Sequence, residues 1–87
     1  MSAESLSAKY IAAMEKSVAG MSRTRGPIFV SEKCIDELLS YVTDYLKDAK
    51  YFRERKEFAT SLTSIAYCEG LLDALKLIGA VDLRLST

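Results

Sequence analysis

Two pairs of carboxylates have the spacing most suggestive of chemistry in this 87-residue chain. Asp44 with Asp48, and Glu69 with Asp73, stand four residues apart, which is about one turn of a helix. Helical divalent-metal enzymes use carboxylates in this arrangement to hold Mg²⁺. Asp44 lies opposite the apolar stripe of its own helical run, so the two pairs would converge only if another subunit intervened. We therefore predict no metal site and no cofactor.

The chain contains no histidine. This absence removes Ser-His-Asp and Cys-His nucleophile systems, and it removes histidine as a metal ligand. The sequence also contains neither a glycine-rich phosphate loop nor a Cys-x-x-Cys motif. It therefore predicts no catalytic residue and disfavours an enzyme. The alternative function that stays open is a metal-dependent phosphohydrolase or nucleotide-processing accessory unit that uses helix carboxylates.

Three charged residues interrupt the apolar pattern of the helical run from Phe58 to Gly79. Glu69 follows Phe58 by eleven residues and Lys76 follows it by eighteen, close to three and five whole turns, so both project along the line of Phe58 and Ile65. Asp73 lies beside them and is four residues from Glu69, a like-charge spacing that mildly destabilises a helix. These charges stand where a core residue is expected.

Two neighbours complete this candidate polar cluster, which consists of Tyr67, Glu69, Gly70, Asp73 and Lys76. A glycine inside a helix costs about 1 kcal/mol relative to alanine, so Gly70 predicts the close approach of another backbone or ring. Three interpretations of the cluster stay open. It is a polar contact site for a partner helix, ligand or symmetry mate, a structural network satisfied by neighbouring helices, or a solvent-exposed seam between two apolar faces.

The composition is that of an ordinary globular protein, with 49% hydrophobic and 28% charged residues. Twelve basic and twelve acidic residues cancel, which disfavours binding to nucleic acid or to an anionic membrane. Residues 1–7 do not resemble a secretory signal, and the uncharged run 59–68 is about half of the ~20 residues that a membrane span needs. We expect a cytoplasmic protein with no membrane span, and we expect Cys34 and Cys68 to be reduced core thiols too far apart for a disulfide.

Apolar spacing predicts the elements that position these residues: an all-α single domain with three main helices. The expected segments are a first helix over about 4–19, a loop over 20–30, a second helix over about 31–54, a third over about 57–78, and a short tail over 79–87. Ser31 suits an N-cap, and Gly79 suits a left-handed helix end. The charged run 53–57 is short enough to make the second and third helices a long antiparallel hairpin.

Apolar stripes predict which helix faces pack. The stripe of the second helix consists of Ile35, Leu38, Leu39, Val42, Tyr45, Leu46, Ala49 and Phe52, and that of the third consists of Phe58, Leu62, Ile65, Ala66, Leu72 and Leu75. The first helix, with Leu6, Tyr10, Ile11, Met14 and Val18, is expected to pack across the hairpin. Val81, Leu83 and Leu85 in the tail could dock back. Because the third helix carries apolar residues around too much of its circumference, we predict a homodimer or a protein partner.

Two segments resemble a known family: Asp48-Ala49-Lys50-Tyr51-Phe52, and the string from Ala66 to Leu75 that contains Tyr-x-Glu-Gly-Leu-Leu-Asp-Ala-Leu. They are similar to the archaeal DUF357 family over roughly Ile35 to Gly79. The resemblance implies an archaeal, cytosolic helical bundle of uncharacterised function, with no catalytic residue to carry over. One departure is Lys56-Glu57, where a Gly-Asp turn is expected.

The hairpin is also distantly similar to HEPN-type helical domains. Their ribonuclease signature needs an arginine and a histidine, so with no histidine only a non-catalytic accessory form is compatible with this chain. The functional prediction is therefore a non-catalytic protein-protein interaction or accessory module, whose contacts involve the second half of the third helix.

Overall fold

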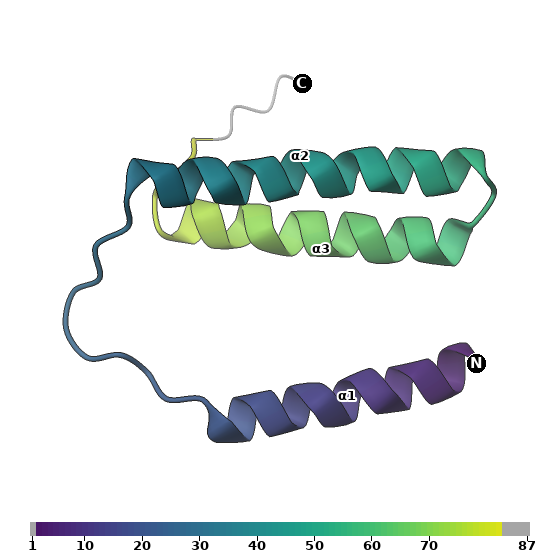
Figure 1. Cartoon of the computed structure of the whole chain (residues 1–87), viewed down its shortest axis with the longest axis horizontal. Helices are drawn as coiled ribbons and strands as arrows, with labels where there is room; N and C mark the ends of the chain where they lie inside the picture. The colour runs from purple at the N-terminus through teal and green to yellow at the C-terminus, as the bar shows by residue number, and fades with distance from the viewer. Residues whose placement is uncertain (1, 83–87) are drawn as a thin grey trace.

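The computed structural model describes residues 2–82 and contains three helices: α1 (Ala3–Gly20), α2 (Glu32–Glu54) and α3 (Phe58–Leu77). α2 and α3 lie side by side as an antiparallel hairpin, and α1 runs along the hairpin at the end of a long connection (Figure 1). The predicted all-α fold with its long hairpin is confirmed. Each helix begins and ends within one residue of its expected bounds.

Side-chain hydrogen bonds fix where the first two helices begin. The Ser31 side chain accepts a hydrogen bond from the backbone N–H of Cys34 at 3.1 Å, so the predicted N-cap of α2 is confirmed. Ser2 caps α1 in the same way, through the N–H of Ser5 at 3.1 Å. α3 has no side-chain cap bond at its N-terminus, because it follows the turn of the hairpin directly.

α2 and α3 both end in a Schellman motif, in which a residue in the left-handed conformation closes the last turn. That residue is Gly79 after α3, with φ of 74°, as predicted. After α2 it is Lys56, with φ of 62°. The closing bonds run from Glu57 N–H to the Phe52 carbonyl and from Ala80 N–H to the Leu75 carbonyl, each at 2.9 Å. The hairpin turn thus keeps a glycine-like backbone while carrying a lysine.

The face of α2 that packs against α3 is the predicted one. Every residue of its stripe is buried or half-buried except Leu46, and Ala49 is the most buried of them. The packed face predicted for α3 is wrong in its first half, because Phe58, Leu62 and Ala66 are exposed. The buried or half-buried residues of α3 are Ser61, Ser64, Ile65, Cys68, Leu71, Leu72 and Leu75.

Small polar side chains hold the first half of this seam. The Ser61 hydroxyl donates to the Ala49 carbonyl at 2.7 Å, and the Cys68 thiol donates to the Val42 carbonyl at 3.3 Å. Such bonds bring the two backbones close, and the small side chains of Ala49 and Ser64 leave room for that approach. Phe58 and Leu62 are too large for this face and lie outside it.

The expected packing of the first helix across the hairpin is not found. Among the described residues, α2 and α3 are the only pair of helices in close contact, and no residue of α1 is buried. The tail reaches the hairpin through Ala80 and Val81, which are half-buried, whereas Leu83 and Leu85 lie outside the described residues.

The two cysteines differ in their surroundings. Both are free thiols, and the expectation of no disulfide between them is confirmed. Cys68 is a core residue as predicted, but Cys34, which sits in the first turn of α2, is exposed. The prediction of a core position for Cys34 is therefore wrong.

Candidate functional site

The five residues of the candidate polar cluster lie on the exposed surface of α3, outside the buried seam. Glu69, Asp73 and Lys76 share one flank with Leu62, since Glu69 follows Leu62, and Lys76 follows Glu69, by two whole turns. Tyr67 occupies the other flank. Gly70 is three residues from both Tyr67 and Asp73, so it lies between the two flanks on the side opposite the seam. The structure thus brings the three charges together and separates them from the tyrosine.

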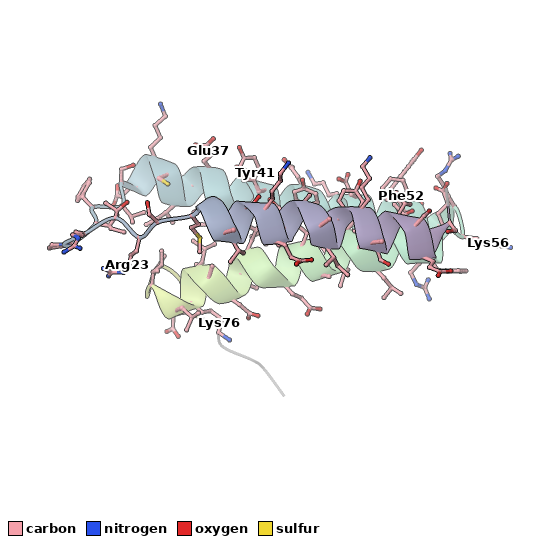
Figure 2. The ribbon with its side chains drawn as sticks, turned by 90° about the horizontal axis from the view of Figure 1, so that it is seen from below. Arg23, Glu37, Tyr41, Phe52, Lys56 and Lys76 are labelled. Atoms are coloured by element: carbon pink, nitrogen blue, oxygen red, sulfur yellow. The ribbon has the colours of Figure 1, made fainter. Side chains whose placement is uncertain are left out.

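The three charged side chains make no hydrogen bond or ion pair with any other described residue. The single ion pair among the described residues joins Arg55 to Glu57 at 3.2 Å. Asp73 and Lys76 line a shallow depression of about 430 Å³ together with Leu77. Figure 2 shows Lys76 at one outer edge of the hairpin and Glu37 with Tyr41 at the opposite edge. This flank has free hydrogen-bonding capacity toward solvent or a partner.

Gly70 is not explained by packing inside the chain. A Cβ placed on it would meet no atom within 4 Å, so the expected close approach of a backbone or ring is absent among the described residues. The helix therefore bears the roughly 1 kcal/mol cost of an interior glycine without a contact that requires it. The position leaves room for a partner to approach α3 at this turn.

Three tyrosines gather on the flank that carries Tyr67. The rings of Tyr45 and Tyr67 lie 4.4 Å apart between centroids, tilted by 42°, and so join α2 to α3. The Tyr41 hydroxyl donates to a Glu37 carboxylate oxygen at 3.2 Å. That bond, with the negative charge of Glu37, raises the pKa of Tyr41 above its ordinary value of 10.0. The three rings form a partly exposed contact surface.

The carboxylate pairs do not assemble into a metal site. No group of three cysteine, aspartate or glutamate side chains that could hold an ion occurs in residues 2–82. Within the same residues, no helix is both long enough and apolar enough to cross a membrane.

Many exposed apolar residues lie in the first helix, which was expected to pack on the hairpin, and in the connection that follows it. From residue 2 to residue 30 every side chain is exposed except Leu6, which is half-buried. We call residues 2–30 the arm. Its exposed apolar residues are Tyr10, Ile11, Met14, Val18, Met21, Ile28, Phe29 and Val30. The sequence offered one signal for this arrangement, the long proline-containing and glycine-containing connection between Gly20 and Ser31.

The arm presents two different apolar sides. One side, with Leu6 and Tyr10, faces Ala59, Thr60 and Thr63 of α3 across a cavity of about 470 Å³. The other side forms an open hollow of about 440 Å³ on α1 itself, lined by Ile11, Met14, Glu15, Val18 and Ala19. Figure 2, seen from below, shows α1 in front of both hairpin helices. A helix with two apolar sides needs two covering surfaces.

The family model for a protein of unknown function, DUF357, matches residues 9–81. The chain belongs to the DUF357 family. The match extends the resemblance seen in the hairpin to residues 9–20 of α1 and to the connection, so most of the arm is part of the DUF357 pattern. No curated protein and no solved structure matches the chain. The function of this DUF357 protein is therefore argued from its surface.

Proposed function

We propose that this DUF357 protein is a non-catalytic protein-protein interaction or accessory module. The observation that supports the proposal is the helix of the arm, α1, which has 18 residues, an N-cap, an apolar stripe and no buried residue. Helices of about 12–15 residues or fewer are marginal in water without a surface to pack against, and α1 is only slightly longer. A contiguous uncovered apolar face of this kind marks a surface for another polypeptide.

The charged flank of α3 supplies the polar part of the proposed contact. Glu69, Asp73 and Lys76 are exposed and free of partners among the described residues, so they can bond to a partner without first breaking a bond inside the chain. Gly70 gives the outer side of α3 an open backbone, and Tyr67 gives the other flank an aromatic ring. In this proposal the apolar arm gives affinity, and the polar flanks of α3 give specificity.

The setting that we propose is the cytoplasm of an archaeal cell. Two free thiols, one of them exposed at Cys34, fit a reducing compartment.

Capture from the native cell tests the proposal. The immobilised full chain is compared with two variants, Ile11→Glu in the arm and Glu69→Gln with Asp73→Asn in α3, and bound proteins are identified by mass spectrometry and re-bound in purified form. We expect a protein that binds the natural chain and loses at least tenfold in affinity with each variant. Ala12→Glu, on the polar side of α1, is the matched control and should bind normally. Retention of no polypeptide by the natural chain, its own copies included, would contradict the proposal.

A further inference from the structure

We infer that the outward side of α1 is covered by a second copy of this chain, with the two α1 helices paired in parallel about a two-fold axis. This inference rests on the proposed function, because it names the polypeptide that covers the arm. Its first support is the amount of uncovered surface. The chain exposes 7895 Å², whereas a compact monomer of 9.7 kDa exposes about 5,100 Å².

The excess is about 2,800 Å² for each copy. Interfaces of obligate dimers bury about 2,000–5,000 Å² in total, which is about 1,000–2,500 Å² for each copy, so a dimer of this class covers much of the excess. The radius of gyration agrees, because it is 16.0 Å where a compact domain of this length has about 12 Å. The zero net charge of the chain adds no repulsion between copies.

The spacing of the outward residues indicates how the two helices meet. Ile11, Met14 and Val18 follow one another at intervals of three and four residues, which are the a, d and a positions of a coiled-coil heptad. All three side chains are more than half exposed. In a parallel coiled coil, β-branched residues at a, here Ile11 and Val18, favour two strands.

Charge also selects the parallel orientation. Glu15 lies at an e position beside the seam and borders the outward hollow of α1. In a parallel pair, e positions face g positions of the partner, so Glu15 would lie near Tyr10 of the second copy. In an antiparallel pair centred on this segment, the two Glu15 carboxylates would face each other and repel. The hairpin side of α1, with Leu6 and Tyr10, stays directed at α3 in the same assembly.

Mass measurement on the purified full chain tests the inference. By light scattering and sedimentation from 1 to 200 μM we expect twice 9.7 kDa. Ile11→Glu should weaken the dimer at least tenfold, whereas Ala12→Glu, which adds the same charge on the other side of α1, should leave it unchanged. Ile11 is 59% exposed, so its replacement removes no core contact of the single chain. Circular dichroism checks that the helices remain.

A mass of 9.7 kDa throughout would overturn the inference. So would equal dimerisation of Ile11→Glu and Ala12→Glu. A monomer that still captures a different protein in the cell would leave the proposed function standing, so the two failures are distinguishable.

Disulfide formation tests the orientation. In a chain carrying Cys34→Ser, Val18→Cys should link to its own mate on mild oxidation, because equivalent d or a residues are neighbours in a parallel pair. In the antiparallel arrangement residue 18 faces residue 11, and the two introduced thiols are about 10 Å apart along the axis. In a mixture, the Ile11→Cys chain could instead form a disulfide with the Val18→Cys chain. If that mixed disulfide forms and two Val18→Cys chains do not link, the parallel arrangement is wrong.

Discussion

The arm and the hairpin contain similar apolar residues and use them in opposite ways. The hairpin buries Ala49, Cys68 and Leu75 along one continuous seam, whereas the arm buries none of its side chains. The difference does not come from helix-forming ability, because α1 is capped and regular along its 18 residues. It comes from the connections. The tight turn at Arg55 and Lys56 keeps α3 next to α2. The connection over residues 21–31 is longer and does not keep α1 next to the hairpin.

The comparison shows that an apolar stripe identifies a helix face that must be buried, but does not identify the surface that buries it. In α2 the cover is α3 of the same chain. In α1 the residues of one side meet only the edge of a cavity, and those of the other side meet open space. Four substitutions, taken from the largest expected effect to the smallest, test whether the two regions differ as described.

Leu75→Ala should cost about 2–5 kcal/mol of unfolding free energy, because Leu75 is 1% exposed and its removal leaves a cavity in the seam. Leu77→Ala, two residues later on the same helix, is the matched control, and its side chain is 88% exposed. We expect its cost to stay within about 0.5 kcal/mol. Urea unfolding followed by circular dichroism measures both. Leu75→Val provides a milder change if the alanine variant does not fold, and equal costs at positions 75 and 77 would break the comparison.

Ala49→Leu should destabilise the chain by about 1–3 kcal/mol, since the added atoms have no space where α2 and α3 approach. The carbonyl of Ala49 also accepts the Ser61 bond, which a displaced helix would lengthen. The same change on the polar side of the arm, Ala12→Leu, should be nearly neutral because nothing packs there. Thermal unfolding compares the two variants. A neutral Ala49→Leu would mean that the seam is loosely packed.

Lys56→Gly should stabilise the hairpin by about 0.5–1 kcal/mol, because glycine adopts the left-handed conformation without the strain of a side chain. The reverse change at the equivalent position after α3, Gly79→Ala, should cost about 1 kcal/mol. Neither change should alter the mass of the assembly, since both lie in the hairpin. Destabilisation by Lys56→Gly, measured in urea, would show that the lysine side chain contributes a contact of its own.

The smallest effect concerns Tyr41, whose raised pKa comes from its bond to Glu37 one turn earlier. A raised pKa in the folded chain means that the neutral hydroxyl is favoured there. Its contribution to stability is therefore present below pH 10 and is lost as the pH rises through the higher folded value. Glu37→Gln should lower the pKa of Tyr41 in an alkaline absorbance titration, with Glu54→Gln as the charge-matched control. An unchanged titration would show that the bond does not persist in solution.

Much of the fold could be predicted from the residues because the signals are local. The caps at Ser31 and Gly79, the long hairpin and the packed stripe of α2 all follow from spacing and backbone preference within one helix. The packed face of α3 could not be predicted this way. Phe58 and Leu62 have more apolar surface than Ser61 and Ser64, so the apolar periodicity predicted that the larger side chains would form the packed face. Close contact between the two backbones instead favoured the smaller ones.

The misassigned face also explains the charges that seemed misplaced. Glu69, Asp73 and Lys76 interrupt the line of Phe58 and Ile65, and that line runs along the edge of the seam, where Ile65 is half-buried and Phe58 is exposed. The three charges are therefore exposed on one flank of the helix. Which flank is covered depends on α2, a neighbour that lies far away in sequence.

By itself, the sequence determined three helices, their ends, the hairpin, the free thiols and membership of the DUF357 family. These properties depend on neighbouring residues and on short-range hydrogen bonds. The tertiary structure alone decided that Ser61, Ser64 and Cys68 form the seam, that Gly70 faces open space and that α1 stands uncovered. Those outcomes depend on how closely two helices approach each other. That distance is set by side-chain volume, interhelical hydrogen bonds and the length of the connection, and it cannot be inferred from one helix alone.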